Sequence, residues 1–410
     1  MPSEPRKRRS LTNVGGGIET EGTADAQLLA HALEVTPSGD DVDDPSRAHV
    51  HGFHTYPARL HPDTAARLVQ AFVPAAGRVL DPFCGSGTVL VEALIQGRRP
   101  FGVDLNPLAV RLARCKTRRR DDPELAQLVI HAQTCATHAD ARRKAKAGAT
   151  RRFSAEDVAL FEPHVLLELD SLRAAIETLP DHPARLDLSL VLSSLLVKLS
   201  KKRGDTSEHV TSRRTAAGAA ARLFVQKTEE LARSFAALRA LLPMTVAHGA
   251  FVEQDNATDL RTLPPVQMDA IITSPPYAAT YDYIAHHALR LRWLGLDAAQ
   301  FIRGEMGARS TYQRIQPGDA AEAWSRELAR FFLAAARVLP IDGPMVLVMG
   351  DSAVGDVALR ADDIVARTAL DHGFFPAARA SQPRPHYHGP TLAAFHNRPR
   401  AEHAILLRRL

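Results

Sequence analysis

The chain has 410 residues, of which 45% are hydrophobic and 24% are charged, as is ordinary for a globular protein. That length favours one enlarged domain, or one domain with a large insertion, over three small ones. The three cysteines, Cys84, Cys115 and Cys135, form no Cys-x-x-Cys pair, which argues against a disulfide framework or a cysteine-rich zinc site. No apolar run approaches a membrane span and no apolar signal core begins the chain, so we expect a cytoplasmic protein without a membrane partner.

The first 47 residues combine Gly-Gly-Gly, Pro-Ser-Gly and an Asp-rich stretch with little periodicity. This composition predicts a mostly disordered N-terminal arm over 1–47, in which only Ala26 to Leu33 favours a short helix. Order is expected to begin near His51. From there, His-Gly-Phe-His-Thr-Tyr-Pro-Ala-Arg-Leu-His leads into an amphipathic helix that runs from Pro62 to about Phe72.

A glycine-bearing turn follows the first predicted strand. Val79–Leu80 ends that strand, Asp81–Gly87 forms the turn, and Thr88–Ile95 starts a helix. Pro100–Val103 is a second strand that ends in Asp104. This order predicts a βαβ nucleotide-binding unit with an acid about 20 residues beyond the glycines, placed to bind ribose hydroxyls. The glycine spacing differs from the dinucleotide pattern Gly-x-Gly-x-x-Gly, which disfavours nicotinamide binding.

Residues 117–242 form a long segment between the second and third predicted strands. Helical periodicity marks Val165–Thr178, Leu186–Leu199 and Leu223–Leu242, and a polar, basic loop lies at Ser200–Ser207. The net charge of +5 is modest, so the clustering of arginine and lysine in this region matters more than the total. Any single basic cluster is explained equally well by a surface that binds nucleic-acid phosphates or by a solvated helix face whose charges pair with nearby acids. The clusters taken together favour nucleic-acid binding.

The sheet is expected to resume at Ala250–Glu253, and Asp255 follows this third strand. Met268–Thr273 is a short apolar, β-branched run that predicts a buried parallel strand. Ser274-Pro-Pro-Tyr277 ends it abruptly, because two prolines have fixed φ angles and cannot donate to a strand ladder. Together they predict a rigid loop at the carboxyl end of a strand, where open α/β sheets bind their ligands.

The last part of the chain alternates helices and strands. Ala320–Leu339 predicts a helix, Met345–Met349 a strand, and Arg360–Asp371 a second helix. Phe375–Ser381 and Ala404–Arg408 predict two final strands.

Two of these motifs carry a resemblance to a known family. Asp-Pro-Phe-Cys-Gly-Ser-Gly-Thr at 81–88, followed by Thr-Ser-Pro-Pro-Tyr at 273–277, resembles the S-adenosylmethionine (SAM)-dependent amino-methyltransferases of DNA, and Ser-Pro-Pro-Tyr resembles their cytosine-N4 branch. The resemblance implies an α/β fold with a Rossmann-like, seven-stranded class I SAM-dependent methyltransferase sheet and a large helical insertion. The catalytic domain would comprise 48–116 and 245–410, and 117–244 would be the insertion and candidate DNA-recognition region.

The resemblance also implies roles for individual residues. The reaction would be carried by Ser274, Pro275, Pro276 and Tyr277: the Ser274 oxygen and the Pro275 carbonyl would accept hydrogen bonds from the target amino group, and Tyr277 would stack on the flipped base. Near the adenine, Asp255 would bind the amino group, with Asp259 as the fallback. The expected SAM-binding residues are Tyr56, Pro57, Arg59, Asp81, Pro82, Phe83, Cys84, Gly85, Ser86, Gly87, Thr88, Asp104, Leu105, Asn106, Asp255 and Thr273. The expected nucleic-acid-binding residues are Lys201, Lys202, Arg203, Arg213, Arg214 and Tyr281, and a loop over 300–320 is suited to help in substrate contact.

The implied function is transfer of a methyl group from SAM to the N4 amino group of a cytosine in double-stranded DNA, with S-adenosylhomocysteine as product and no metal. Such an enzyme would be cytoplasmic and associated with the nucleoid, and would act alone or beside a cognate restriction endonuclease. Two alternatives stay open. One is methylation of adenine N6 or of an RNA amino group, and the other is a non-catalytic nucleic-acid-binding protein with the same fold.

Overall fold

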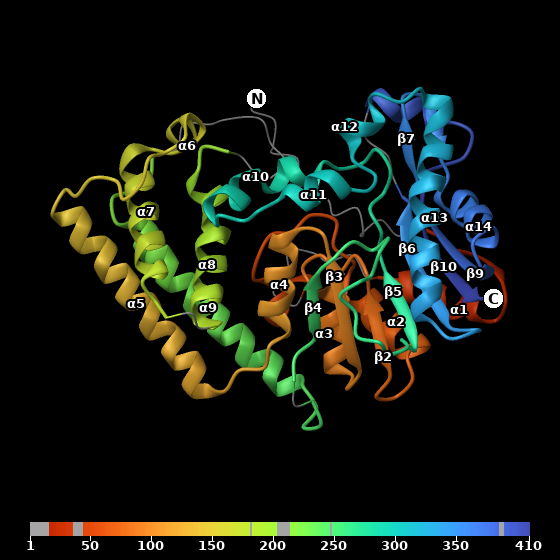
Figure 1. Ribbon diagram of the computed structural model, residues 1–410, viewed down its shortest axis with the longest axis horizontal. Helices are drawn as coiled ribbons and strands as arrows, with labels where there is room; N and C mark the ends of the chain where they lie inside the picture. The colour runs from red at the N-terminus through yellow and green to blue at the C-terminus, as the bar shows by residue number, and fades with distance from the viewer. Residues whose placement is uncertain (1–15, 36–43, 181–182, 203–213, 247, 385–388) are drawn as a thin grey trace.

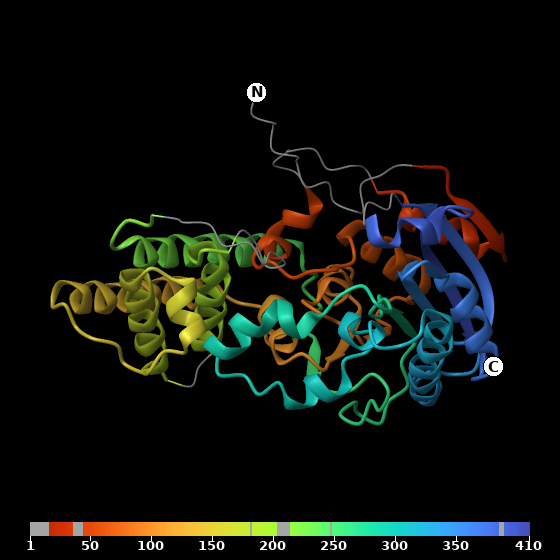
Figure 2. The same cartoon turned by 90° about the horizontal axis from the view of Figure 1, so that it is seen from above.

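The structure is a computed structural model that describes residues 16–35, 44–180, 183–202, 214–246, 248–384 and 389–410. The predicted DNA-contacting residues Arg203 and Arg213 lie outside the described residues. Figures 1 and 2 show a twisted central sheet flanked by helices, with a separate group of helices beyond one edge of the sheet.

One eight-stranded sheet forms the centre of the molecule. In spatial order its strands are β1 (Glu19–Gly22), β9 (Phe374–Pro383), β10 (Ala401–Arg409), β6 (Pro344–Gly350), β5 (Ala270–Thr273), β2 (Arg78–Asp81), β3 (Arg99–Asp104) and β4 (Phe251–Gln254). Strands β6, β5, β2, β3 and β4 run parallel to one another, whereas β10 runs antiparallel to both β6 and β9. The expected seven-stranded sheet is confirmed, its two final strands form an antiparallel pair, and β1 adds an eighth strand.

Both faces of the sheet are buried, which explains why its central strands are continuously apolar. Val79 and Ile272 point into a core shared with the helices of one face, and their neighbours Leu80 and Ile271 point into the core of the other face. The first face is covered by α1 (Asp25–Leu33), α2 (Pro62–Phe72) and α3 (Thr88–Ile95). The second face is covered by α13 (Ala320–Val338) and α14 (Ala361–Leu370).

The N-terminal region is more ordered than its composition predicts. Strand β1 pairs with β9 from Glu19 to Gly22, and α1 buries Leu29 and Leu33 against the sheet. The expectation of a disordered arm is therefore wrong for residues 16–35, although the short helix at Ala26–Leu33 is confirmed. The reason is tertiary: an exposed, polar four-residue strand is stabilised by backbone hydrogen bonds to β9, which the local sequence does not reveal.

The excursion between β3 and β4 is helical, as expected. It follows α4 (Pro107–Thr117) and contains α5 (Asp122–Lys144), α6 (Ala155–Leu160), α7 (Pro163–Glu177), α8 (Pro183–Leu199) and α9 (Ala219–Leu241). These helices share one hydrophobic core with helices that flank the sheet, because Leu94 of α3 and Leu112 of α4 belong to the same cluster as Leu169 and Leu188. Figure 1 shows them beyond the β4 edge of the sheet.

A buried ion pair fixes the start of this insertion. Arg120 donates from Nη2 and Nε to the two carboxylate oxygens of Asp187 on α8, at 2.6 and 3.0 Å. Its guanidinium also lies 3.6 Å from the ring centroid of Phe235 on α9. A planar, bidentate contact of this kind orients both partners, so the chain leaves α4 in a defined direction.

Short elements complete the fold. They are η2 (Pro45–Arg47), η3 (His49–Gly52), α10 (Tyr283–Trp293), α11 (Ala299–Gly304), α12 (Arg309–Tyr312), η4 (Pro317–Asp319), the hairpin β7 (Ser352–Val354) and β8 (Val357–Leu359), and η5 (Gly389–Phe395). Among the described residues, no helix has the length and apolar character needed to cross a membrane.

Candidate active site

The glycine turn after β2 takes a backbone shape that only glycine adopts easily. Gly85 and Gly87 have φ angles of +50° and +86°, in the left-handed region. A β-carbon on Gly85 would lie 3.2 Å from the Tyr56 ring, and one on Gly87 would lie 3.1 Å from the backbone of Ala113. The two glycines therefore allow Tyr56 to close over the turn and α4 to pack beneath it.

Asp104, at the end of β3, is oriented by two backbone donors. Its Oδ2 accepts from the Gly85 N–H at 2.9 Å and its Oδ1 from the Asn106 N–H at 2.8 Å. Burial raises the pKa of Asp104 to about 6. Asn106 caps α4 through the Leu108 N–H and donates from Nδ2 to the Tyr56 hydroxyl at 3.2 Å. The turn, the acid and Tyr56 are thus one connected unit.

A cleft of about 90 Å³ opens above this unit. Predicted cofactor residues on its wall are Tyr56, Pro82, Phe83, Gly85, Asp104, Leu105 and Asn106, and they are joined there by Ser274 and Pro276. A recess of about 30 Å³ continues over the glycine turn and is lined by further predicted residues, namely Arg59, Asp81, Cys84, Ser86 and Thr88. The structure therefore brings most of the predicted cofactor set together.

Four predicted cofactor or catalytic residues, besides Asp255, do not line these spaces. Pro57, Gly87, Thr273 and Pro275 are absent from the walls described above and from that of the larger cavity below. Thr273 is fully buried, and its hydroxyl donates to Asp81 Oδ1 at 2.6 Å. This bond joins the end of β5 to the end of β2, and burial raises the pKa of Asp81 to about 7.

The adenine-binding role expected for Asp255 has no support in its position. Asp255 Oδ2 instead accepts from the backbone N–H and hydroxyl of Thr262, at 2.7 and 2.9 Å. The fallback, Asp259, lies 3.7 Å from Arg261 and also does not line the cleft. The residue after the strand that does reach the wall is Asn256, because side chains alternate in direction along an extended chain.

The far wall of the cleft was not predicted. It comprises Asn256, Ala257, Thr258, Tyr283, Phe301, Gly304, Glu305 and Met306. The predicted substrate loop at 300–320 thus contributes its first residues to the cofactor cleft. The only sequence signal was the polar Asn-Ala-Thr run after β4, and nothing local marks Phe301 or Met306.

The Ser-Pro-Pro-Tyr loop separates the cleft from a larger cavity of about 330 Å³. Ser274 lines this cavity, the cleft and the recess, and so does Ala58. Tyr277 lies on the side of the larger cavity, where its hydroxyl donates to Glu402 Oε1 at 3.5 Å. Burial raises the pKa of Tyr277 above its usual value. Ser274 and Ala58 therefore lie where the two spaces meet, and Ser274 is the one of the two with a polar side chain.

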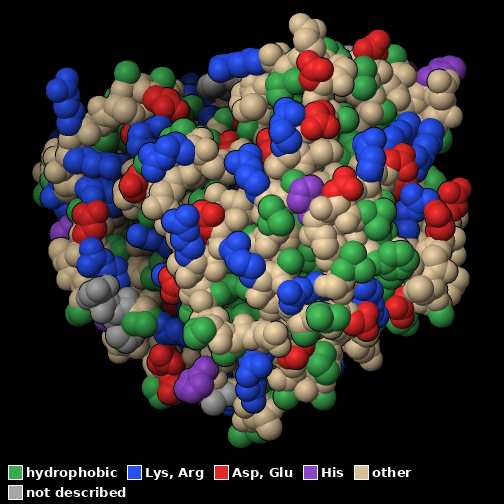
Figure 3. All heavy atoms as spheres, turned by 45° about the vertical axis from the view of Figure 1, so that its right-hand side comes forward, with side chains coloured by type: hydrophobic (Ala, Val, Ile, Leu, Met, Phe, Trp, Pro, Cys, Tyr) green, Lys and Arg blue, Asp and Glu red, His purple; other side chains and the backbone are tan. Residues whose placement is uncertain are grey.

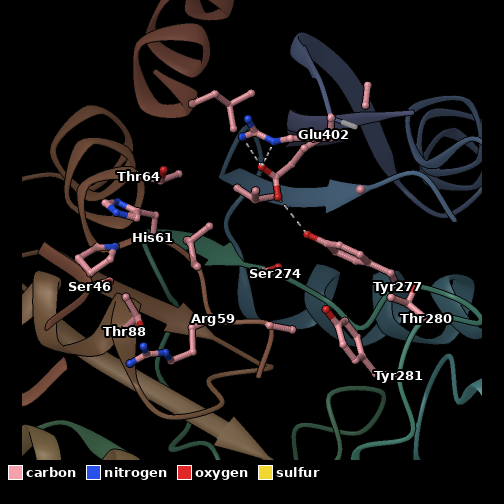
Figure 4. Close-up of a pocket in the computed structure, with 18 of the residues that line it drawn as sticks. Ser46, Arg59, His61, Thr64, Thr88, Ser274, Tyr277, Thr280, Tyr281 and Glu402 are labelled. Atoms are coloured by element: carbon pink, nitrogen blue, oxygen red, sulfur yellow. Dashed lines mark hydrogen bonds and ion pairs between the residues drawn. The ribbon is translucent and has the colours of Figure 1, made fainter. Parts of the chain in front are cut away.

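The larger cavity is walled by segments that are distant in sequence. Figure 4 shows Ser274, Tyr277 and Tyr281 on one side, His61 and Arg59 on another, and Glu402 across from them. The remaining lining includes Asp44, Ser46, Thr64, Thr88, Thr280, Gly350, Arg384 and Arg400. Tyr281, which is predicted to bind nucleic acid, also lines this cavity.

The predicted basic residues lie elsewhere. Lys201, Lys202 and Arg214 belong to the insertion and are not part of the cavity walls. Lys201 donates from Nζ to the Ala159 carbonyl at 2.9 Å, which gives it a structural partner. Arg214 is exposed.

The site has features that fit SAM. The glycine turn lines the cleft and the recess through Gly85, and Asp104 holds a carboxylate on the cleft wall, at the place expected for a ribose diol. The buried hydroxyl of Ser86 lines the recess and has no hydrogen-bond partner among the described residues. Such a group fits a polar end of a ligand, because burying an unpaired hydroxyl is costly.

The strand order, the antiparallel β10, the glycine turn after β2 and the acid at the end of β3 together define a class I SAM-dependent methyltransferase fold. At a finer level, residues 36–114 match the model of a family described as DNA methylase, the N6/N4 type. That segment contains the Tyr56 region, the glycine turn and Asp104.

Curated relatives also match over a limited length, and this chain spans less than a fifth of each of those described below. The type II methyltransferase M.MvaI of Kocuria varians is 37% identical over 82 residues, which are 19% of this chain and 18% of that protein. The type II methyltransferase M.MjaII of Methanocaldococcus jannaschii is 29% identical over 82 residues, or 20% and 16% of the two chains. A tRNA (guanine(10)-N2)-dimethyltransferase of Methanothermobacter thermautotrophicus is 42% identical over 52 residues, or 12% and 16%.

Solved structures show a distant likeness. TrmN from Thermus thermophilus is 13% identical with a TM-score of 0.33, and covers 86% of this chain and 49% of its own. The rRNA methyltransferase aviRa from Streptomyces viridochromogenes is 14% identical with a TM-score of 0.32, and covers 92% and 95%. The fold assignment therefore depends on the strand order itself.

Proposed function

We propose that this protein transfers a methyl group from SAM to the exocyclic N4 amino group of a cytosine flipped out of double-stranded DNA. The observation that carries the proposal is the position of Ser274, which lines both the cofactor cleft and the larger cavity. The match of residues 36–114 to the DNA methylase family supports DNA as the substrate. The larger cavity supports base flipping, since a base within a duplex could not enter it.

When bound, SAM supplies a methyl group activated by its sulfonium. The residues of the chain then provide position and electrostatics. Asp104 and the glycine turn hold the cofactor, and the hydroxyl of Ser274 accepts a hydrogen bond from the target amino group. Pro275 itself does not line the cleft or the larger cavity, so its part is to fix, together with Pro276, the orientation of Ser274.

The target nitrogen needs hydrogen-bond acceptors because its lone pair is delocalised into the cytosine ring, which makes it a weak nucleophile. Acceptors on its hydrogens stabilise the positive charge that develops on nitrogen as the N–CH₃ bond forms and the S–CH₃ bond breaks. The nitrogen then releases one of these hydrogens to solvent as a proton, which gives neutral N4-methylcytosine. Tyr277 offers an aromatic face in the larger cavity against which the flipped base stacks. The reaction thus takes place at the wall that Ser274 shares between the two spaces.

The test is incubation of the protein with mixed-sequence duplex DNA and isotopically labelled SAM, followed by mass spectrometry of the nucleosides. We expect labelled N4-methylcytosine. A Ser274→Ala variant should lower the rate by about 10²-fold or more, the range for loss of one preorganised hydrogen-bonding group. Ser189→Ala is the matched control, because its hydroxyl donates within α8 to the Arg185 carbonyl.

The other outcomes separate the alternatives. Labelled N6-methyladenine without methylcytosine would contradict the base assignment but keep the cofactor site. Label in total RNA instead of DNA would move the substrate to RNA. If neither nucleic acid is labelled while SAM binds, the protein is a non-catalytic member of the fold.

A further inference from the structure

The wall of the larger cavity that faces Ser274 comes from the last two strands of the sheet. It contains Arg384, directly after β9, Arg400, directly before β10, and Glu402, the second residue of β10. We refer to these three residues as the β9–β10 wall. They lie more than 100 positions beyond Ser274 in the sequence, and the proposed transfer step does not use them.

Glu402 is held in a fixed orientation. Its Oε2 accepts from Arg384 Nη2 at 2.7 Å and from Nε at 3.1 Å, and the Arg384 side chain is only 5% exposed. Its Oε1 meets the Tyr277 hydroxyl at 3.5 Å, near the outer limit for a hydrogen bond. Figure 4 shows the contact between this carboxylate and Tyr277 as a dashed line. A carboxylate oxygen can accept two donors, so Oε1 keeps room for one from a substrate.

Arg400 is anchored beside the same aromatic ring. Its Nε donates to the Asp351 carbonyl at 2.7 Å. Gly350 lies between the two side chains: a β-carbon there would be 3.0 Å from Tyr277 Cε2 and 3.3 Å from Arg400 Nη2. The guanidinium and the ring therefore pack over bare backbone, and a base stacked on Tyr277 would meet Arg400 and Glu402 at its edge.

We propose that Glu402 and Arg400 are specificity-determining residues that select cytosine at this site, an inference that rests on the proposed function. Glu402 accepts from the exocyclic amino group, and the Arg400 fork donates to ring N3 and carbonyl O2. Cytosine presents this order of one donor and two acceptors along its pairing edge. Adenine presents its amino group and one ring nitrogen but has a C–H where cytosine has O2, so one arginine donor would be left unpaired.

Bases with a carbonyl in place of the amino group are rejected more strongly. Thymine or uracil would point an oxygen at the Glu402 carboxylate and a ring N–H at Arg400, so both contacts would be mismatched. A planar guanidinium that makes two parallel bonds carries geometric selectivity that a lysine ammonium lacks. A good bidentate contact to a base discriminates on the order of 10- to 100-fold.

The experiment measures labelled N4-methylcytosine and N6-methyladenine from one duplex DNA preparation for each variant, with SAM binding and thermal melting as controls. Arg400→Met should lower the cytosine rate by about 10- to 100-fold and raise the adenine share of the product. Glu402→Gln should lower both products in proportion, because both bases carry an amino group. Arg398→Met is the matched control, since Arg398 pairs with Asp362 and Asp363 outside the cavity.

An unchanged cytosine rate and product ratio in Arg400→Met, with wild-type N4-methylcytosine present, would overturn the proposal and leave the proposed function intact. If Arg400→Met fails to fold, Arg400→Lys keeps the charge and removes the fork, and the same change in ratio is required of it. If the wild-type protein labels no cytosine, that result contradicts the proposed function itself. The two failures are thus distinguishable.

Discussion

Two opposing effects set the pKa of the Asp104 carboxyl group, which must be ionised to bind a ribose diol. Burial raises its pKa, while the Gly85 and Asn106 N–H groups each stabilise one carboxylate oxygen and limit the rise to a pKa of about 6. At neutral pH the carboxylate is therefore ionised. Each oxygen still has a lone pair for one hydroxyl of a ribose diol, and only the ionised form can accept from both.

SAM binding should consequently weaken in acid. Below pH 6 the affinity should fall by up to about tenfold per pH unit, because a proton occupies the site of a ribose hydrogen bond. Isothermal titration calorimetry between pH 5 and 8 would measure this. Asp81 and Glu305, whose pKa values burial raises to about 7, also face the cofactor spaces, so Asp104→Asn is the needed control.

The Asp104→Asn variant should bind SAM weakly, and its SAM affinity should no longer change near pH 6. If a change near pH 6 persists in this variant, another group causes it. Acid is expected to affect folding stability in the opposite direction from SAM affinity. Because the pKa of Asp104 is higher in the folded protein than its ordinary 3.8, its protonation stabilises the folded state between pH 6 and 4. Lost binding in that range is therefore not unfolding caused by this group.

The segment before α2 connects the cofactor cleft to the helical insertion. His54 Nε2 bonds the Ser193 hydroxyl of α8 at 3.2 Å, in a buried contact. The Thr55 hydroxyl accepts from Arg290 Nη2 at 3.0 Å, and the Tyr56 ring stacks on His287 with centroids 4.8 Å apart. The residue that closes over Gly85 is thus held from outside by α8 and α10.

Ser193→Ala should therefore weaken SAM binding, although Ser193 does not line the cofactor cleft. A lost hydrogen bond of about 1 kcal/mol corresponds to roughly a fivefold change in Kd. Ser194→Ala is the neighbouring control, because that hydroxyl donates within its own helix to the Val191 carbonyl at 2.7 Å. Equal SAM affinity in the two variants, measured by calorimetry, would show that the contact does not position Tyr56.

The sequence predicted elements with strong local signals and missed those that depend on distant partners. The β5 strand and its double-proline loop, the glycine turn, and helices α7, α8 and α9 each have an apolar pattern or a fixed turn residue. Helix α5 was not singled out, because its buried side is a narrow stripe that includes small residues such as Ala132 and Ala139. Strand β1 has four exposed residues and no apolar alternation.

The candidate site follows the same division. The glycine turn and Asp104 are linked by about one βαβ unit, so spacing alone places them together. Whether Asp255 or Asn256 faces the cleft depends on the residue at which β4 ends, because a shift of one residue turns each side chain to the opposite side. The Arg384–Glu402 pair depends on the pairing of β9 with β10, and no motif near either residue indicates that they border a cavity.

The net charge is unevenly distributed over the molecule. Residues 117–244 contain 21 of the 51 lysines and arginines and 16 of the 46 acids, which leaves 30 of each for the rest of the chain. The whole excess of +5 therefore lies in the insertion. On the face shown in Figure 3, which brings the α13 and α14 side forward, basic and acidic side chains are interspersed. A basic region attracts the phosphate backbone without reading sequence, which supports the proposal that the insertion contacts DNA.

Reversing two charges of the insertion should weaken DNA binding without changing the cofactor site. In a Lys202→Glu, Arg214→Glu variant, affinity for duplex DNA should fall, and the slope of log K against log salt should decrease by about 2 if each residue meets one phosphate. Fluorescence anisotropy at several salt concentrations would measure the slope, with SAM affinity unchanged. The control is Arg326→Glu, Arg330→Glu on α13, which makes the same change in net charge on a helix outside the insertion. If both variants lose affinity and slope equally, DNA binding responds only to total charge, and the insertion has no special part in it.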